Sequence, residues 1–376
     1  MTIRQKITHN LLNMPGWKTN RHIVVIESDD WGSIRMPSKE VYEKLLRAGI
    51  RVDRCHYCSF DSLAREADLS ALFEVLHSVT DKNGCPAVIT ANAVVANPDF
   101  EKIRQEGFER YYNKVITDGF KEVKGCEKSL ELWKEGNKDG YFVIQSHGRE
   151  HLNVARWMRC LKSGLKETRL AFDFGVYGIS TTITSEQRKS YLPAFDFDND
   201  EEEVAVNDIA VDGLEIFRNM FGFKSESFIA PNYTWGRSLE KAIGDYGVKY
   251  IQGTQLSRYK NSFGEDNIRR LRATGKRNQY GQINLSRNAV FEPSANRHQD
   301  WVDSCLADIA IAFRWKCPVI ICSHRVNFIG ILDQTNRDNG LKSLATLLGR
   351  IKQKWPDVEF MSSNQLGHLI DSSLKK

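Results

Sequence analysis

Short apolar runs alternate with longer amphipathic runs along the chain. The short runs are rich in β-branched and aromatic residues and are bounded by turn residues, which is typical of buried strands. We expect such strands at 22–28, 87–94, 141–147, 227–231, 248–253, 318–324 and 358–363. The amphipathic runs predict helices at 61–79, 151–164, 202–221, 238–246, 300–316 and 339–355.

This alternation predicts the fold class. It favours an α/β protein in which helices cover a parallel sheet that is either open or closed into a barrel. No internal repeat, low-complexity tract or linker interrupts the pattern, so we expect one domain over 1–376. The stretches 172–197 and 255–294 fit the alternation poorly and are expected to be loop insertions, which in barrels often carry function.

Composition and charge exclude two classes of protein. The formal charge is only +5, and the basic residues are interleaved with acidic ones, so the chain lacks the charge pattern of a nucleic-acid-binding protein. No stretch approaches the roughly 20 apolar residues of a membrane span, and residues 1–20 lack the apolar run of a secretory signal. We therefore expect a cytoplasmic protein with neither a nucleic-acid partner nor a membrane span. The acidic run 200–203 is expected to begin a helix, where carboxylates complement the helix dipole.

The eight cysteines form no framework of close spacings. Cys55 and Cys58 have the spacing of half a zinc site, but no second pair of ligands lies nearby in the sequence to complete it. Reduced, partly buried thiols are the expected state.

Polar side chains follow four of the predicted strands at their carboxyl ends: Asp29 and Asp30, His147 and His151, Asn232 and Tyr233, and His324. The carboxyl ends of parallel strands share one face, where α/β proteins bind their ligands. If the chain turns helical after 147, the spacing of the first two histidines places both imidazoles on one side of the helix. One carboxylate with two imidazoles suits zinc or another first-row divalent ion.

With these motifs the chain resembles the polysaccharide deacetylases, a family of metal-dependent carbohydrate esterases. The first motif of the family is an Asp-Asp pair after a buried strand, matched here by Asp29 and Asp30. The second consists of a histidine, a serine or threonine, two residues and a second histidine. His147 and His151 match it, with Gly148 at the hydroxyl position.

Two further motifs are matched in part. The Arg-x-Pro-Tyr-like loop of the family corresponds to 229–233, and its Leu-x-His motif corresponds to 321–324 with a shift of one residue. The resemblance covers about residues 23–328. It implies a distorted (β/α) barrel of about seven parallel strands with helices outside.

The chain departs from the family at two charged positions. Ile229 stands where the family has an arginine that orients the catalytic aspartate, and the candidates for a substitute are Arg149, Arg237 and Arg325. The family also has an acidic residue that orients the late histidine, and the candidates for it are Asp173, Asp196, Asp198 and Asp333.

The resemblance implies that Asp29 is a general base and that Asp30, His147 and His151 bind the metal ion, zinc or another first-row divalent ion. Such an ion lowers the pKa of a bound water from 15.7 toward ~7 and polarises an acyl oxygen. His324 is expected on the opposite side as the acid that protonates the leaving nitrogen, because imidazole titrates near neutral pH.

The remaining expectations concern the substrate. Trp31, Tyr233 and Trp235 are expected to offer flat faces to a sugar ring, and the turn at Asn232 to supply oxyanion-binding amides. Gly32 is expected to provide the turn that lets both carboxylates reach one site. The predicted function is removal of an acetyl group from an N-acetylated or O-acetylated sugar or polysaccharide precursor.

Three other functions share parts of this pattern. Two histidines and a carboxylate also describe a mononuclear iron oxygenase, although the strand–helix alternation speaks against the usual β-barrel of that class. A glycoside hydrolase needs two carboxylates roughly 5–9 Å apart, whereas Asp29 and Asp30 are adjacent. A carbohydrate-binding protein on a diverged deacetylase barrel is the non-enzymatic alternative, suggested by Ile229.

Overall fold

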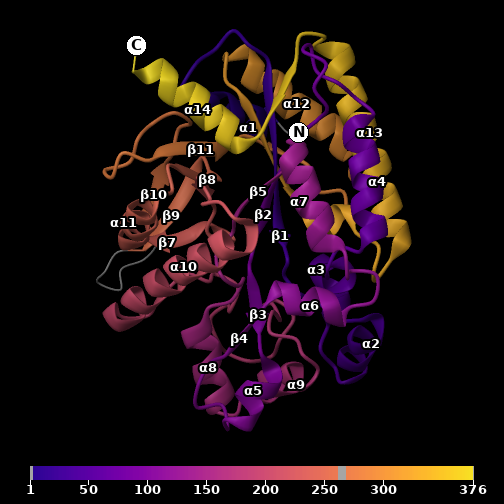
Figure 1. The fold of residues 1–376 in the computed structure, drawn as a ribbon, viewed down its shortest axis with the longest axis vertical. Coiled ribbons are helices and arrows are strands. Elements are labelled where there is room, and N and C mark those ends of the chain that lie inside the picture. Colours follow the sequence, from indigo (N-terminus) through magenta and orange to yellow (C-terminus); the bar gives the residue numbers. More distant parts are fainter. Residues whose placement is uncertain (1–2, 261–267, 376) are drawn as a thin grey trace.

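A parallel sheet runs through the middle of the molecule, with helices around it (Figure 1). The computed structural model describes residues 3–260 and 268–375. In this part of the chain the main sheet has nine strands, in the order β11-β8-β6-β5-β2-β1-β13-β12, and β14 pairs with β1. Its strands are β1 (Ile23–Trp31), β2 (Ile89–Ala93), β5 (Phe142–Ser146), β6 (Ser227–Phe228), β8 (Tyr250–Thr254), β11 (Ile283–Arg287), β12 (Ala289–Val290), β13 (Val319–His324) and β14 (Glu359–Met361).

The sheet curls into a nearly closed barrel. Its two end strands, β11 and β12, are consecutive in the chain, so one segment pairs with β8 through Ile283–Arg287 and with β13 through Ala289–Val290. Pairing of β1 is split on its other edge, where 23–25 pair with β14 and 26–31 with β2. These irregular pairings account for the distortion of the barrel that the resemblance implied. The expected (β/α) barrel is confirmed.

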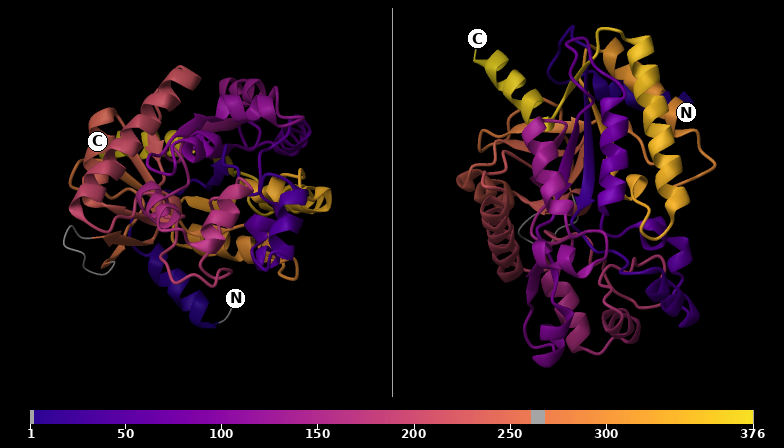
Figure 2. Two further views of the ribbon diagram at one scale, coloured as in Figure 1. Left: turned by 90° about the horizontal axis from the view of Figure 1, so that it is seen from below. Right: turned by 45° about the vertical axis from the view of Figure 1, so that its right-hand side comes forward.

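The described helices surround the barrel and cover one end of it (Figure 1 and Figure 2). They are α1 (Ile3–Asn13), α2 (Lys39–Arg47), α3 (His56–Phe60), α4 (Glu66–His77), α5 (Phe100–Gln105), α6 (Ile116–Glu122), α7 (Ser129–Asp139), α8 (Val154–Lys162), α9 (Lys166–Asp173), α10 (Asp200–Phe221), α11 (Arg237–Tyr246), α12 (Trp301–Arg314), α13 (Gln334–Lys354) and α14 (Ser363–Leu374). Helices such as α4, α7, α10 and α13 flank the sheet, whereas α2, α5, α8 and α9 lie beyond one end of it. None of the described helices is both long and apolar enough to cross a membrane.

Strand β1 is the centre of the core because all nine of its residues are buried. Val24 and Ile26 belong to the large apolar cluster. It also contains residues of α4 and α7, and leucines of α13 such as Leu344. Ile23 and Val25 belong to a separate apolar cluster with residues of β8, β11 and α14. The strand is therefore apolar on both sides at its start, and its polar residues are confined to its carboxyl half.

The seven strands expected from the sequence are all present in the main sheet, and two further strands of that sheet, β11 and β12, were missed. Both lie in the stretch 255–294, whose polar and arginine-rich composition predicted a loop. Two smaller sheets of the described chain were not expected either: β3 (Ala96–Pro98) with β4 (Asn113–Val115), and β7 (Thr234–Gly236) with β9 (Leu256–Lys260) and β10 (Ile268–Leu271). The acidic run 200–203 does begin a helix, α10, behind the N-cap residue Asn199. The helix expected over 151–164 begins only at Val154, because the Asn153 side chain caps it by accepting a hydrogen bond from the Arg156 amide.

Candidate functional site

Strand register brings the predicted site residues to one end of the barrel. In the parallel pair of β1 and β13, Asp29 lies opposite His324. In the pair of β2 and β5, Ala93 lies opposite Ser146, and His147 follows directly. The carboxyl ends of these strands therefore share one face, as is usual for ligand sites in α/β barrels.

The backbone at the aspartate doublet is irregular. The register with β2 shifts between Ser28 and Trp31, and Asp30 has a φ of 72°, in the left-handed region. The bend therefore begins at Asp30, two residues before Gly32, where the sequence placed the turn. Gly32 also has a positive φ, of 88°, and a Cβ there would lie 2.6 Å from the Val94 carbonyl oxygen, so this position requires glycine. Non-glycine residues in left-handed conformations are frequent at functional sites.

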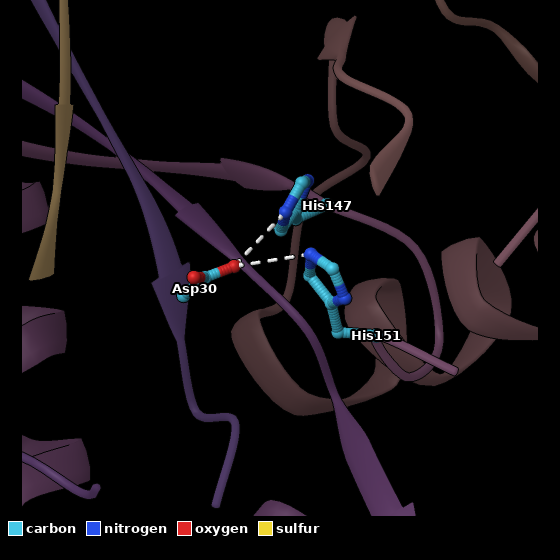
Figure 3. A group of neighbouring side chains, drawn as sticks. All are labelled: Asp30, His147 and His151. Carbon is cyan, nitrogen blue, oxygen red and sulfur yellow. Dashed lines mark ion pairs between the residues drawn. The ribbon is translucent and has the colours of Figure 1, made fainter. Parts of the chain in front are cut away.

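Asp30, His147 and His151 form a cluster that we call the triad (Figure 3). The Asp30 Oδ1 atom lies 3.3 Å from His147 Nε2 and 3.4 Å from His151 Nε2. Figure 3 shows the three side chains pointing toward one another. The sequence thus identified the members of the cluster correctly.

The reason offered for the histidine spacing was wrong. Residues 147–153 form a loop between β5 and α8, so the two histidines do not lie on one helix. Gly148, with a φ of 95°, turns this loop, and a Cβ there would lie 2.8 Å from the Phe195 ring. The resulting turn places the two imidazole centroids 5.3 Å apart. Glycine therefore stands at the hydroxyl position of the motif because of the backbone turn and the ring packed against it.

The triad fits a divalent cation. All three residues are buried, and Asp30 Oδ1 has no hydrogen-bond partner in the described part of the chain, although an isolated buried carboxylate oxygen is costly. His147 Nδ1 donates a hydrogen bond to the Ile229 carbonyl oxygen at 2.9 Å. This contact leaves the Nε2 lone pair directed toward Asp30. Burial lowers the pKa of His151 to about 3, so this imidazole is neutral, as a metal ligand must be.

Asp29 has a different environment, although it is the next residue. Arg287 donates two hydrogen bonds to it, from Nη2 to Oδ1 at 2.6 Å and from Nη1 to Oδ2 at 2.8 Å. Asn92 donates a third, at 2.8 Å. Burial raises the pKa of Asp29, but the Arg287 guanidinium outweighs burial and lowers the pKa to about 2. Asp29 is thus an oriented carboxylate that stays ionised at neutral pH.

Arg287 also binds Glu27, and we call Glu27, Asp29 and Arg287 the paired cluster. The Arg287 Nε donates to Glu27 Oε2 at 2.6 Å. Glu27 and Asp29 are two apart on β1, so their side chains point to the same side of the strand. Arg287, at the end of β11, therefore forms ion pairs with two buried carboxylates at once. Burial nevertheless raises the pKa of Glu27.

Arg287 is the arginine that orients Asp29, and it was not among the candidates named from the sequence. The three candidates named from the sequence do not contact Asp29. Arg149 pairs with Glu150 and Asp212, Arg325 pairs with Asp61, and Arg237 is the exposed first residue of α11. The segment "INLSR" at 283–287 was a possible signal of strand β11, but its polar surroundings concealed it.

Glu292 orients His324. The His324 Nδ1 lies 2.5 Å from Glu292 Oε1, and the other carboxylate oxygen accepts a hydrogen bond from Asn327 at 2.8 Å. His324 Nε2 faces Asp29 Oδ2 at 3.8 Å. Burial lowers the pKa of His324, but the Glu292 charge and hydrogen bond outweigh it and raise the pKa well above 6.5. His324 is therefore a protonated imidazole at neutral pH, available as an acid.

The four aspartates named as candidates for this role are engaged elsewhere. Asp173 pairs with Arg104, Asp196 and Asp198 pair with Arg156, and Asp333 pairs with Arg297. Like Arg287, the missed residue Glu292 belongs to the segment that was read as a loop. The Phe291 amide hydrogen-bonds the Cys322 carbonyl oxygen at 2.9 Å and so holds this segment against β13.

The aromatic residues expected to contact a sugar lie in different places. Trp31 and Trp235 are 1% and 2% exposed, and their indole nitrogens donate to Ser28 and Glu240. Neither ring therefore presents an open face to a sugar. Tyr233 is half-buried, and its hydroxyl accepts a hydrogen bond from Arg287 at 2.8 Å. It therefore lies at the paired cluster.

The turn that follows β6 has two left-handed residues, Asn232 with a φ of 55° and Tyr233 with a φ of 53°. Asn232 is exposed at the carboxyl end of the strand. The Tyr233 amide donates to the Ala230 carbonyl oxygen, and Pro231 has no N–H. Of the amides expected to bind an oxyanion, that of Asn232 is the one that the turn leaves for a ligand.

The remaining candidates for metal binding are a second group of side chains and the cysteines. Glu292, Cys322 and His324 lie close enough together for a second group of possible ligands. However, the histidine and the carboxylate of this group are already bonded to each other. Cys55 and Cys58 belong to no such group among the described residues, and all eight cysteines are free thiols, as expected.

Comparison with known proteins gives likenesses of fold alone. No family model and no curated protein matches the chain. A probable polysaccharide deacetylase from Pseudomonas aeruginosa PAO1 is 10% identical, with a TM-score of 0.46 over 94% of this chain and 93% of that one. The peptidoglycan deacetylase PdaC from Bacillus subtilis is 7% identical, with a TM-score of 0.33 over 95% and 94%. A GH57-type branching enzyme from Pyrococcus horikoshii is 12% identical, with a TM-score of 0.42 over 92% and 70%.

Proposed function

We propose that this protein is a metal-dependent hydrolase that removes an acetyl group from an N-acetylated or O-acetylated sugar or polysaccharide precursor. One observation carries the proposal: two adjacent buried aspartates have opposite environments. Among the described residues Asp30 Oδ1 has no hydrogen-bond partner and faces two histidines, whereas both oxygens of Asp29 accept hydrogen bonds and Oδ2 faces His324 at 3.8 Å. This is the division between a ligand and a base that amide or ester hydrolysis requires.

Asp30, His147 and His151 would hold the ion, with zinc as the first candidate because its usual ligands are imidazole nitrogens and carboxylate oxygens. When bound there, the ion would supply Lewis acidity toward the acyl oxygen and toward a water molecule. The contact between His147 Nδ1 and the Ile229 carbonyl fixes the tautomer and the ring orientation. Ile229, which replaces the family arginine, therefore contributes through its backbone.

Asp29 would accept the proton of the attacking water. Its orientation comes from the Arg287 fork, and its pKa of about 2 ensures that it is ionised whenever the protein is folded at neutral pH. A carboxylate of such low pKa is a weak base, so its contribution comes mainly from position. Arg287 and Asn92 hold that position.

His324 would donate a proton to the departing nitrogen or oxygen. The Glu292 carboxylate keeps the imidazole protonated and directs Nε2 toward the side of the site that Asp29 occupies. The pair is thus a positioned acid beside a positioned base, on carboxyl ends of neighbouring strands. The Asn232 amide would complete the site by donating to the developing oxyanion.

The structure weakens the alternatives. The binding-only reading arose from Ile229, and Arg287 now stands beside Asp29 in place of the missing arginine. A glycoside hydrolase needs a second acid free to act on the bond, whereas both Glu292 oxygens are engaged by His324 and Asn327.

The test is acetate release from N-acetylated and O-acetylated sugars and short oligosaccharides by protein loaded with zinc, with metal content measured on the same sample. We expect release that a chelator abolishes and that added zinc restores. Sugar binding without acetate release from any substrate would support the non-enzymatic alternative.

A further inference from the structure

Arg35 is unlike the other buried arginines of the described chain. It is 5% exposed, and among the described residues its Nη1 atom has no hydrogen-bond partner, which is also true of Arg325 Nη1. What sets Arg35 apart is the lack of an ion pair. The other buried arginines each form an ion pair with a carboxylate: Arg149, Arg156, Arg272, Arg287 and Arg325. No such pair forms between Arg35 and the described residues. A buried guanidinium without a bonded anion is costly, so a protein keeps one where a ligand supplies the anion.

Arg35 lies beside the candidate site. Its guanidinium carbon is 5.5 Å from the centroid of the Tyr57 ring, and that ring is 5.5 Å from the His324 ring. Burial lowers the pKa of Arg35, but nearby groups, among them Tyr177 and Asp30, outweigh burial and raise the pKa. The Tyr57 ring therefore adjoins both the guanidinium and the His324 ring of the candidate site.

The chain does not join these two opposite charges. Asp30 Oδ1 and Arg35 Nη1 are both buried, neither has a hydrogen-bond partner in the part of the chain that the structure describes, and no ion pair links them. Arg325 donates two hydrogen bonds to Oδ1 of Asp61, another nearby carboxylate. Asp61 Oδ2 has no hydrogen-bond partner among the described residues, and no ion pair joins Asp61 to Arg35 there. If Asp30 holds a divalent cation, its charge is used by that cation, and Arg35 is left as a second positive charge beside it.

We propose that Arg35 binds an anionic oxygen group of the substrate, a carboxylate or a phosphate, next to the triad. The guanidinium fork matches the geometry of both groups and binds them through two parallel hydrogen bonds. This inference deepens the proposed function and rests on it, because it places the acyl group at the triad and the anionic group at Arg35. The substrate is then an acidic acetylated sugar.

Gly178 offers an independent way to disturb the same guanidinium. A Cβ at this position would lie 2.9 Å from Arg35 Nη1 and 3.3 Å from a Leu192 methyl carbon. Gly178 does not have a positive φ, so alanine there adds a methyl group without backbone strain. The Gly178→Ala substitution therefore displaces Arg35 while its charge remains.

The experiment compares sugars that differ only in charge. Calorimetric titration on zinc-loaded Asp29→Asn protein, in which turnover is suppressed, would measure the affinities of N-acetylglucosamine, its 6-carboxylate, its 6-phosphate and its 1-phosphate. We expect at least one anionic sugar to bind about 10–100-fold more tightly than the neutral one, the range of a charge-assisted hydrogen-bonded pair. The carboxylate and phosphate arms identify the source of the anion.

Variants then assign the preference to Arg35. Arg35→Met should remove it and leave the affinity for N-acetylglucosamine and the zinc content unchanged, and Gly178→Ala should reduce it. Arg51→Met, which removes an exposed guanidinium paired with Asp53, is the matched control and should keep it. If Arg35→Met does not fold, Gly178→Ala carries the test.

The outcomes separate the two claims. No preference for any anionic sugar, or a preference that persists in both Arg35→Met and Gly178→Ala, overturns the role of Arg35, whether or not acetate is released. A preference that depends on Arg35 in a protein that releases no acetate supports the anion site and overturns the proposed hydrolase.

Discussion

Asp29 and Asp30 are the same amino acid, adjacent in sequence and each 3% exposed, yet they lie in two different regions. Asp29 belongs to the paired cluster, where Arg287 and Asn92 bond both of its oxygens. Asp30 belongs to the triad, where no described residue forms a hydrogen bond with Oδ1. The difference teaches that the chemistry of a buried carboxylate depends on what the neighbouring strands bring to it.

The bend in β1 makes this separation possible. Successive side chains on a strand point to opposite sides, so Asp29 joins Glu27 on one side while Asp30 faces the other. The left-handed backbone at Asp30, with a φ of 72°, then turns its carboxylate toward the loop that carries His147 and His151. Both carboxylates thereby serve one site from different sides.

The largest effect should come from the triad. Asp30→Ala removes one of three proposed ligands and should abolish metal binding and acetate release together, because the two remaining imidazoles leave the ion weakly held. Metal content by atomic emission and acetate release would be measured on the same preparation. Retention of stoichiometric metal by this variant would exclude Asp30 as a ligand.

The paired cluster should respond differently. Asp29→Asn keeps the shape of the side chain and removes its charge, so we expect full metal content and a rate lower by about 10²–10⁴-fold, as for loss of a general base. The same two measurements apply. If Asp29→Asn loses the ion while Asp30→Ala keeps it, the two roles are reversed.

Removal of Arg287 should affect folding more than metal binding. Arg287→Met leaves Glu27 and Asp29 buried without their shared cation, and we expect a loss of about 3–5 kcal/mol in the free energy of unfolding. Urea denaturation of the metal-free protein would measure it, with Arg51→Met at the exposed Asp53 pair as the control near zero. A loss below about 1 kcal/mol would contradict the idea that the ion pairs of Arg287 with Glu27 and Asp29 stabilise the fold.

The smallest effect is a change in pH dependence. Because Glu292 raises the pKa of His324 well above 6.5, the protonated acid persists at neutral pH, and the rate should fall only as the pH rises through that raised value. Glu292→Gln removes the charge, lowers the pKa and should move this fall to lower pH. The pH profile of the initial rate checks the direction, and an unchanged profile would mean that another group donates the proton.

The same shift affects stability. A histidine whose pKa is raised on folding stabilises the protein fully below its unfolded pKa of about 6.5, and this contribution is lost as the pH rises through the folded pKa. Glu292→Gln should therefore reduce the difference in unfolding free energy between acidic and alkaline pH. Urea denaturation at several pH values would measure that difference.

The sequence by itself determined the elements that have a strong local pattern. The seven expected strands and their parallel sheet followed from apolar runs, and the polar residues at the carboxyl ends indicated a common site. The barrel and the choice of the triad came from the resemblance to a known family. These signals are local: a buried strand reads as a short apolar run, and parallel strands place their ends on one face. The spacing of His147 and His151 was informative even though a loop, and not a helix, places them.

Only the tertiary structure decided which charged residues meet. Arg287 and Glu292 flank the short strand β12, in a segment too polar to be recognised as part of the barrel, and they reach Asp29 and His324 because that segment closes it. The burial of Trp31 and Trp235 was equally invisible, because an aromatic residue beside a polar site reads the same whether it faces the ligand or the core. The physical reason is that strand pairing and burial depend on contacts between residues far apart in the chain, and no local pattern encodes those contacts.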